Sequence, residues 1–371
     1  MKQISALELH FLVKELKDLE NSRVDKIYNN GKEEIYIQLH KSNAGRKLLR
    51  IIVGRSIFLT ETKSVDEKPS GFCLLLRKNL EGKFLDSIKQ LEPERILKFN
   101  FKSKNETKKL YLEFFGKGNV ILCNNDGVII DCSIKHKFKD RSILPKQNYI
   151  YPNMRYNLFN IDKKDIVDLL KNSKRDKVIT CLATELGLGG VYSEEICLLS
   201  NIDKNNNPQK INNNEITKIS DSIKEIINKK NNPQVVYKDK ELIDAVPINL
   251  ELYKANEKKE FSNYNNALNE YYMHELKFIK EKESPYAKKI NELKWILGEQ
   301  EDTLNNLKVK EIENRKKGEL IYNNYQLIKE ILGEINKANK KYSWKEIKDK
   351  LKGHKIVKDV DVKEKKIIVQ I

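Results

Sequence analysis

Alternating apolar and polar residues divide residues 1–132 into two helices and a series of short strands. Ser5 followed by Glu8 has the spacing of a capping box and predicts a helix that runs to about Leu19. A shorter helix is predicted over Gly71–Leu80. The expected strands are Arg23–Tyr28, Glu34–His40, Lys47–Val53, Ser56–Thr62, Lys83–Leu91, Arg95–Phe101, Lys109–Phe115, Asn119–Cys123 and Val128–Cys132. Many short strands at this spacing predict a sandwich or a strongly bent sheet.

A helical module is predicted after a polar joint at Tyr151–Asn160. Its expected helices are Lys163–Lys171, Arg175–Leu186, Val191–Leu199 and Glu215–Asn228. Strand patterning returns at Gln234–Tyr237 and Val246–Glu251. The helical module therefore interrupts the β-rich part of the chain before that part is complete.

From Tyr272 onward, apolar residues follow the three-and-four spacing of a heptad repeat, which predicts a coiled-coil helix. The apolar positions are Tyr272, Leu276, Ile279, Tyr286, Ile290, Leu293, Leu297, Leu304 and Leu307. Ser284-Pro285 predicts a kink or a new helix start. Helices at Gly318–Asn339 and Trp344–Leu351, and a strand pair at Lys355–Val360 and Lys365–Ile371, complete the pattern. A helix with one apolar seam needs a partner helix, and none of matching length follows it.

Composition adds a strong positive charge, since 71 Lys and Arg outnumber 54 Asp and Glu and leave a net charge of +17. Such an excess favours a polyanionic partner, because each neutralised phosphate releases counterions. A lysine- and asparagine-rich proteome would give the same excess, so charge alone does not identify nucleic acid. The five cysteines form no CxxC pair and the five histidines are scattered, so no metal site and no cofactor are expected. The sequence has no signal peptide and no long apolar run, which predicts a cytoplasmic protein that does not enter a membrane.

Three cations are candidates for contact with phosphate: Arg77 and Lys78, at the end of an apolar run, and Arg95, which follows Glu94. Arginine presents a planar fork to phosphate oxygens, whereas lysine acts as a mobile point charge. The alternatives are a solvated helix end for Arg77 and Lys78, and a surface ion pair for Arg95.

Two glycine-rich turns are further candidates. Lys117 lies between Gly116 and Gly118, where it can meet a phosphate at the tip of a turn, although the pattern lacks the spacing of a P-loop. The second turn, Leu186-Gly187-Leu188-Gly189-Gly190, precedes a helix, and amides at a helix start bind phosphate. The acidic pair that follows, Glu194 and Glu195, would repel an anion there, so a structural turn is the favoured alternative.

The order of these motifs resembles the NFACT family of ribosome-associated quality-control proteins, which are called NEMF in animals and RqcH in bacteria and archaea, and were once called fibronectin-binding protein A. The resemblance is carried by Phe72–Phe101 with its Gln90-x-x-x-Glu94-Arg95 element, by the two glycine turns, and by later segments in the same order. The family usually has Asp in the contexts of Glu8 and Glu94, and it links these acidic residues and the arginine to transfer-RNA engagement. Glu retains the charge at each position with one more methylene group.

The resemblance implies an α+β fold in five parts. These are a mixed, β-sandwich-like, glycosylase-like NFACT domain (1–160), a helix-hairpin-helix-like module (161–232), return strands (233–262), a first coiled-coil helix (263–317) and a small α/β tip (318–371). It also implies that the chain is the N-terminal portion of a longer, archaeal protein, without the returning coiled-coil helix and the C-terminal RNA-binding domain.

The function implied is recognition of a large ribosomal subunit with stalled peptidyl-tRNA and recruitment of charged tRNA, chiefly alanyl-tRNA, for template-free tailing. Ribosomal RNA is the other expected partner, and the ribosome, not this protein, would form the peptide bond. The site residues expected from this resemblance are Glu8, Arg77, Lys78, Glu94, Arg95 and Lys117, with Gly187, Gly189 and Gly190 as a possible phosphate-contact turn. The alternatives are a glycosylase-fold DNA-binding or repair protein, or a coiled-coil interaction scaffold.

Overall fold

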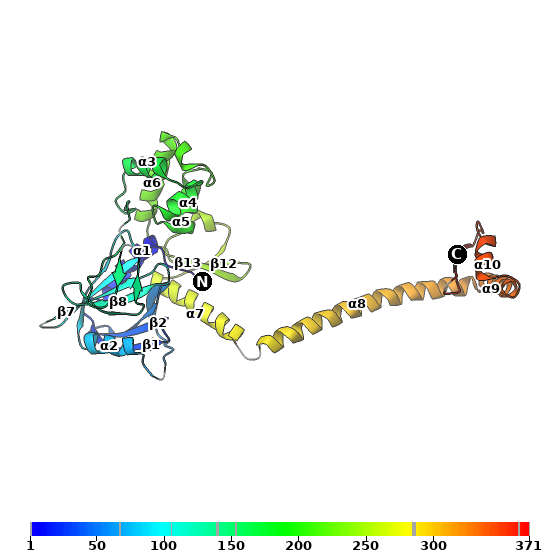
Figure 1. Ribbon diagram of the computed structural model, residues 1–371, viewed down its shortest axis with the longest axis horizontal. Helices are drawn as coiled ribbons and strands as arrows, with labels where there is room; N and C mark the ends of the chain where they lie inside the picture. Colours follow the sequence, from blue (N-terminus) through cyan, green and yellow to red (C-terminus); the bar gives the residue numbers. More distant parts are fainter. Residues whose placement is uncertain are drawn as a thin grey trace. The chain divides into compact units, whose positions relative to one another are not determined.

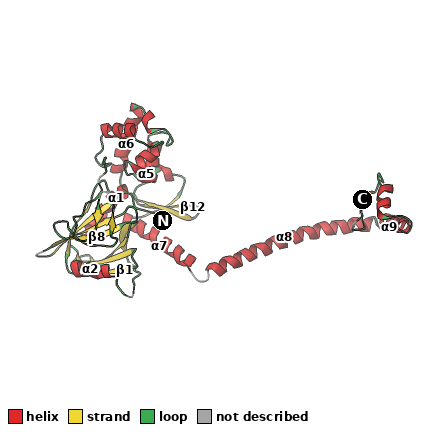
Figure 2. Cartoon of the chain, viewed as in Figure 1, coloured by secondary structure: helices red, strands yellow, loops and turns green. Residues whose placement is uncertain are grey.

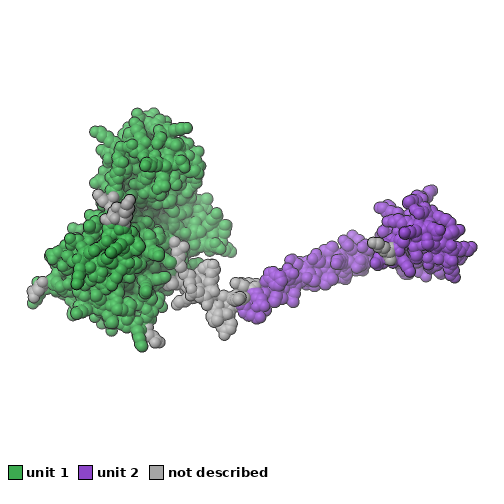
Figure 3. All heavy atoms as spheres, viewed as in Figure 1, with its two compact units in different colours: residues 1–279 green, residues 280–371 purple. Residues whose placement is uncertain are grey.

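The computed structural model describes residues 2–66, 68–104, 106–138, 141–152, 154–283, 287–362 and 364–370. The chain forms two compact units, unit 1 (residues 1–279) and unit 2 (residues 280–371), which are coloured separately in Figure 3. Each is described here by itself. The α+β character expected from the sequence is confirmed (Figure 2).

Unit 1 contains a nine-stranded antiparallel sheet in the order β4-β3-β2-β1-β5-β6-β7-β8-β9. Its strands are β1 (Arg23–Asn30), β2 (Glu34–Lys41), β3 (Gly45–Ile52), β4 (Ser56–Thr60), β5 (Phe84–Gln90), β6 (Ile96–Lys102), β7 (Thr107–Glu113), β8 (Asn119–Cys123) and β9 (Ile129–Cys132). Two further short strands, β10 (His136–Lys137) and β11 (Ser142–Ile143), pair with each other. Local patterning therefore predicted the strands of the main sheet to within a few residues.

The sheet changes direction between β1 and β5, where only Arg23 and Phe84 are paired. Helix α2 (Gly71–Leu80) and its C-cap residue provide hydrogen-bond partners for the residues of β1 that are not paired with β5. The Arg77 Nε donates to the carbonyl oxygen of Ile27 at 2.6 Å, and the Ile27 amide donates to Glu81 at 3.2 Å. Because an unpaired strand edge leaves backbone groups unsatisfied, these side chains stabilise the bend.

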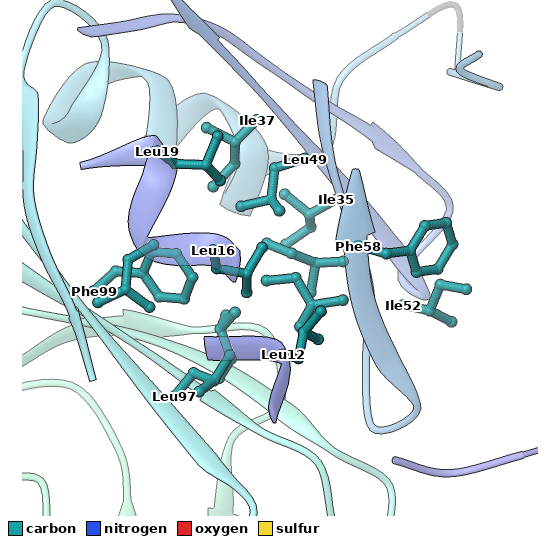
Figure 4. Close-up of a cluster of buried hydrophobic side chains, with 14 of the residues drawn as sticks. Leu12, Leu16, Leu19, Ile35, Ile37, Leu49, Ile52, Phe58, Leu97 and Phe99 are labelled. Carbon is teal, nitrogen blue, oxygen red and sulfur yellow. The ribbon is translucent and has the colours of Figure 1, made fainter. Parts of the chain in front are cut away.

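Helix α1 (Ala6–Leu16) lies between the two halves of this bent sheet and is continued by a short 3-10 helix, η1 (Lys17–Leu19). The predicted capping box of Ser5 and Glu8 is present. Figure 4 shows Leu12 and Leu16 of α1 between apolar residues of β2 and β3 on one side and of β6 on the other. The sandwich-like core is thus built from one continuous sheet that wraps around α1.

The predicted helical module is formed by α3 (Lys163–Asn172), α4 (Val178–Thr184), α5 (Gly189–Leu199) and α6 (Asn213–Asn228), with the 3-10 helix η2 (Pro208–Lys210) in the loop before α6. These helices are grouped together in Figure 1. Leu7 and Phe11 of α1 belong to the apolar core of this module, whereas Leu9 and Leu12 belong to the core of the sheet. Helix α1 is therefore buried on two faces and joins the two cores.

A separate three-stranded sheet in the order β13-β12-β14 follows the helical module. Its strands are β12 (Gln234–Lys238), β13 (Glu241–Val246) and β14 (Glu257–Glu260). The strand expected at Val246–Glu251 is wrong, because a tight turn at Asp239 and Lys240, each with positive φ, brings the chain back five residues earlier than expected. Pro247 follows β13, and the 3-10 helix η3 (Glu251–Tyr253) occupies the end of the expected strand.

The first residues of helix α7 (Tyr264–Glu283) are held by a carboxylate of α1. Glu15 accepts hydrogen bonds from the Tyr264 amide (2.7 Å), the Asn265 amide (3.0 Å) and the Asn265 side chain (2.7 Å). A carboxylate at a helix N-terminus satisfies free amides and interacts favourably with the helix dipole. Glu15 therefore fixes the start of α7 from a position some 250 residues earlier in the chain.

Unit 2 consists of α8 (Ala287–Asn323), α9 (Tyr325–Asn339), α10 (Trp344–Lys350) and the paired strands β15 (Val357–Asp361) and β16 (Lys366–Val369). The helix start expected at Gly318 is wrong, because α8 runs through that residue and ends at Asn323. A glycine within a helix weakens it without ending it. The heptad residues Leu293, Leu297, Leu304 and Leu307 are exposed on α8. Ser284, Pro285 and Tyr286, where a kink was predicted, lie outside the described residues.

All five cysteines are free and buried. Within the described part of the chain, no helix combines the length and the apolar character needed to span a lipid bilayer.

A buried ion cluster joins the N-terminus of the chain to α1 and β13. The Lys2 ammonium lies 2.6 Å from Glu8 Oε1 and 2.5 Å from Asp244 Oδ1. Burial alone would lower the pKa of Lys2, but the attraction and hydrogen bonds of Asp244 and Glu8 outweigh it and raise that pKa above 10.5. Lys2 is therefore a fixed positive charge between two carboxylates.

Three tyrosines complete this cluster from other elements. Tyr192 of α5 donates to Glu8 at 3.1 Å, and Tyr253 of η3 donates to Asp244 at 2.7 Å. Tyr272 of α7 donates to the carbonyl oxygen of Lys2 at 3.0 Å. The cluster thus connects the helical module, the small sheet and α7 to the first residues of the chain.

We predict that Lys2→Met lowers the free energy of unfolding by about 3–5 kcal/mol, because two buried carboxylates lose their common cation. Urea unfolding of unit 1 followed by circular dichroism measures this loss. Lys2→Met combined with Asp244→Asn should recover part of the stability. A Lys2→Met variant as stable as the parent would show that the cluster does not hold the unit together.

The same cluster predicts a dependence on alkaline pH. A lysine whose pKa is higher in the folded than in the unfolded state stabilises the folded state. This contribution to the free energy of unfolding is complete below pH 10.5 and is lost as the pH rises further. The difference in unfolding free energy between the parent and Lys2→Met should therefore narrow above that pH. A difference that stays constant would contradict the ion cluster.

We predict that Glu15→Ala lowers the free energy of unfolding of unit 1 by about 2 kcal/mol, because the first amides of α7 lose a charged acceptor. Glu61→Ala is the matched control, since Glu61 is exposed and has no bond among the described residues. Urea unfolding compares the two variants. Equal stability of the two would show that α7 does not depend on Glu15.

Candidate functional site

One open cavity of about 800 Å³ brings together residues that are far apart in the sequence. It lies in unit 1 and is lined by the start of the chain and α1, by the turn between β5 and β6, and by the start of α5. Six residues expected from the sequence to be functional line this cavity: Glu8, Glu94, Arg95, Gly187, Gly189 and Gly190. The sequence motifs therefore converge in space, although their spacing along the chain gave no indication of this.

Arg95 has a half-buried side chain at the wall of the cavity. Burial lowers the pKa of its guanidinium, and the negative charges of Glu94 and Glu8 oppose that shift. Within the described part of the chain, Arg95 makes no ion pair and no side-chain hydrogen bond. Its five donors are therefore available to a ligand. The surface ion pair considered for Arg95 is not formed.

Glu94 precedes Arg95 at the same turn and is buried. Burial raises the pKa of its carboxyl, while the neighbouring charge of Arg95 acts in the opposite direction. Gln90 holds this turn against α1, because its side-chain amide donates to the carbonyl oxygens of Ala6 (2.9 Å) and Glu94 (3.1 Å). The Gln-x-x-x-Glu-Arg element is thus a positioning glutamine followed by two residues that face the cavity.

The start of α5 opens onto the same cavity through the second glycine turn. Gly187 and Gly189 have φ values of 78° and 76°, which only glycine adopts without strain. The N-cap residue, Leu188, has no side chain that bonds the first amides of the helix. These amides and the helix dipole therefore provide an uncapped positive end beside Arg95.

The acidic pair of α5 has partners of its own, which corrects part of the expectation that it repels an anion at this end. Glu195 is completely buried and accepts hydrogen bonds from the amides of Glu251 (2.9 Å) and Leu252 (2.8 Å). Glu194 lies one turn after Gly190 and lines a second cavity with it, but its charge is paired with Lys204.

The charge of the cavity is mixed and not uniformly positive. Its walls contain the carboxylates of Glu8, Glu94 and Asp244 and the cations Lys2 and Arg95. Lys2 forms ion pairs with two of these carboxylates, Glu8 and Asp244, and its single positive charge balances one of them. Arg95 is left as the cation that faces the cavity without a direct partner among the described residues.

Arg77 and Lys78 do not line this cavity. Arg77 bonds the edge of β1, and its guanidinium carbon lies 5.7 Å from the centre of the Tyr28 ring. The Lys63 ammonium lies 3.7 Å from the centre of the same ring. Lys78 is exposed at the end of α2. The Nε of Arg77 is bonded to the backbone and lies 3.7 Å from Glu81, so Arg77 is more than a solvated helix end, and a phosphate contact by its other N–H groups stays a prediction.

Lys117 is exposed at the turn between β7 and β8 and does not line the cavity either, although Phe115 of the same turn does. Gly118 of this turn has a clear structural role. A Cβ atom there would lie 2.1 Å from the backbone of Gly54, so the close approach of the two turns requires glycine.

The polar residues of the cavity that sequence reasoning missed include Lys2, Tyr192, Asp244 and Tyr253. Tyr192 directly follows the glycine turn and could have been included with it. Lys2 and Asp244 are 242 residues apart, and neither belongs to a recognisable pattern. Only the tertiary structure shows that they share an ion pair.

Comparison with known proteins places this geometry in a family. Residues 5–370 match the NFACT N-terminal and middle domains. Over 370 residues the chain is 34% identical to the archaeal Rqc2 homolog aRqcH of Methanocaldococcus jannaschii, a match that covers 95% of this chain and 55% of that relative. It is 32% identical over 195 residues to ribosome quality control complex subunit 2 of Saccharomyces cerevisiae, covering 50% of this chain and 18% of that protein.

Two solved structures share the fold. The fibrinogen-binding protein from Staphylococcus aureus has a TM-score of 0.61 at 20% identity, covering 72% of this chain and 98% of its own. The N-terminal part of the fibronectin/fibrinogen-binding protein from Streptococcus suis has a TM-score of 0.59 at 21% identity, covering 73% of this chain and all of its own. The family match extends over almost the whole chain, and the protein therefore belongs to the NFACT family.

Proposed function

We propose that this protein is a ribosome quality-control factor that binds a large ribosomal subunit with stalled peptidyl-tRNA and recruits charged tRNA, chiefly alanyl-tRNA, for C-terminal tailing. The relatives' names support this role, since they are ribosome quality control subunits from archaea, yeast and bacteria. The chain spans 55% of the archaeal relative, so the activity of the whole protein is part of the proposal. Transfer RNA, ribosomal RNA and a cytoplasmic location follow from the same role.

The observation that carries the proposal is the unpaired guanidinium of Arg95 in a cavity with buried carboxylates. An arginine fork binds phosphate oxygens or the acceptor edge of a base in two-point geometry. The carboxylate of Glu94 accepts hydrogen bonds from amino groups of bases or from ribose hydroxyls. The free amides at Gly189 and Gly190 suit a phosphate oxygen. Mixed charge of this kind suits a nucleotide of the transfer RNA better than an isolated phosphate.

The proposed role needs no acid–base catalysis by this protein, because the ribosome forms the peptide bond. The amine closest to the N-terminus that the structure describes is Lys2, which its two carboxylates keep protonated. A protonated amine is not a nucleophile, which argues against glycosylase chemistry at this position. We therefore propose a glycosylase-like arrangement of the N-terminal domain without glycosylase activity.

We further propose that α7 and α8 form the first helix of a coiled-coil arm. Leu293, Leu297, Leu304 and Leu307 form an exposed apolar seam on α8, which needs a second helix to cover it. In the full-length protein, a returning helix would cover this seam and lead to the C-terminal RNA-binding domain. The helices α9 and α10 with their strand pair would form the tip of the arm.

We predict that Arg95→Ala abolishes alanine tailing in cells that lack the native gene and leaves the unfolding midpoint of the purified protein almost unchanged. Arg95 makes no ion pair among the described residues, so its loss removes a ligand contact without breaking an internal bond. Tailing is measured by mass spectrometry of a stalled reporter peptide, and binding by co-sedimentation with large subunits that carry peptidyl-tRNA.

Arg46→Ala is the control for this experiment, because it removes the same charge from an exposed side chain of unit 1 outside the cavity. Its tailing should equal that of the parent. Unimpaired tailing by Arg95→Ala would show that Arg95 takes no part in the mechanism. An equal loss of tailing in Arg95→Ala and Arg46→Ala would show that the effect comes from the change in net charge.

A further inference from the structure

The outer face of the main sheet has a cluster of lysines that the cavity does not use. On β6, Leu97 and Phe99 point into the apolar core, so Lys98 lies on the opposite, outer face. By the same alternation, Lys89 of β5 and Lys109 of β7 lie on that face, next to the buried residues Ile88 and Leu110. None of the three lysines lines the cavity.

Strand register brings these ammonium groups together. Lys89 is directly opposite Lys98, and Lys98 is paired with Tyr111, two residues from Lys109 on the next strand. Directly opposite residues have Cβ atoms about 5 Å apart and diagonal neighbours about 7–8 Å apart. Like charges at these positions repel each other, so the arrangement costs stability in the free protein.

Among the residues that the structure describes, no carboxylate forms an ion pair with this cluster. Lys89 and Lys98 form no ion pair with any residue that the structure describes, and Lys109 donates to the carbonyl oxygen of Asn125. Burial lowers the pKa of Lys98, and the positive charges of Lys109 and Lys89 add to the shift. By contrast, Lys102 at the rim of the same face is paired with Asp86 at 3.0 Å.

The neighbouring residues limit the kind of ligand that this surface fits. Ser87 and Asn100 lie beside the lysines and are hydrogen-bonded to each other at 2.8 Å. Tyr111, the aromatic residue of this face nearest to Lys98, is buried under Tyr149, with ring centres 4.2 Å apart. The ring opposite Lys98 is thus closed to base stacking, while the three ammonium groups suit phosphate groups.

We propose that Lys89, Lys98 and Lys109 form a docking surface for the phosphate backbone of RNA, separate from the cavity and independent of nucleotide sequence. Lys98 lies three residues after Arg95, which directly precedes β6, so one RNA molecule can contact the cavity and this face. The choice of RNA over other polyanions rests on the proposed function. Bound phosphates would neutralise the repulsion that the free protein tolerates.

The test compares the full chain with the triple variant K89Q/K98Q/K109Q. Binding to a short RNA duplex of arbitrary sequence is measured by fluorescence anisotropy over a series of KCl concentrations. The variant should bind more weakly, and the slope of log K against log[KCl] should become shallower by about 2–3, since each lost phosphate contact removes about 0.9. The variant's urea midpoint should equal or exceed the parent's, because repulsion is removed.

The matched control is K171Q/K218Q/K224Q, which removes three exposed lysines from the helical module. Its slope should change by less than about 1. Equal slope changes in the two triple variants would overturn the proposal, because net charge would explain them. A lower urea midpoint for K89Q/K98Q/K109Q would also overturn it, by showing that the lysines are structural.

Two further arms separate this inference from the proposed function. Arg46→Ala, whose exposed side chain lies outside the cavity and outside the lysine cluster, should change the slope by less than about 1. Because the duplex assay measures salt dependence and not tailing, failure of the tailing experiment and failure of this one are distinguishable. A poly-glutamate peptide tests the other class of polyanion. If K89Q/K98Q/K109Q loses affinity for the peptide and not for the duplex, the surface binds an acidic protein and the RNA proposal is wrong.

Discussion

The ion cluster of Lys2, Glu8 and Asp244 is the interaction on which the rest of unit 1 depends. Three charged groups are buried at one place, and removal of the lysine would leave two carboxylates without their common cation. Their positions require the N-terminus, α1 and β13 to be in place together. Because Tyr192 and Tyr272 bond the same cluster, α5 and α7 are fixed by it as well. The shape of the cavity is therefore a consequence of how these charges are satisfied.

The same cluster explains why Arg95 can act on a ligand. Lys2 holds Glu8 and Asp244 in ion pairs, and Arg95 forms no direct ion pair among the described residues, although the charges of Glu94 and Glu8 act on it. Glu94 stays buried beside it, held by the turn that Gln90 fixes. A protein that binds RNA through this cavity thus combines an ion-paired wall with one available cation, while wider contact with phosphate falls to other surfaces of a strongly basic chain.

Local structure could be predicted from the sequence, whereas long-range pairing could not. The capping box at Ser5, helix α2 and strand β8 follow from spacing within a few residues, and the structure confirms them. The pairing of Lys2 with Asp244 has no local signal, because 242 residues separate the two. Arg77 was expected to contact a ligand, yet it bonds the open edge of β1, a role that appears only once β5 is known to leave that edge unpaired.

The most direct test of the account is a structure of this chain bound to a large ribosomal subunit that carries transfer RNA. The account predicts an RNA nucleotide inside the cavity, with a phosphate or base oxygen within hydrogen-bond distance of the Arg95 guanidinium and the Lys2 cluster unchanged. A bound transfer RNA that leaves the cavity empty, or an Arg95 that turns to pair with Glu8 or Glu94, would contradict it.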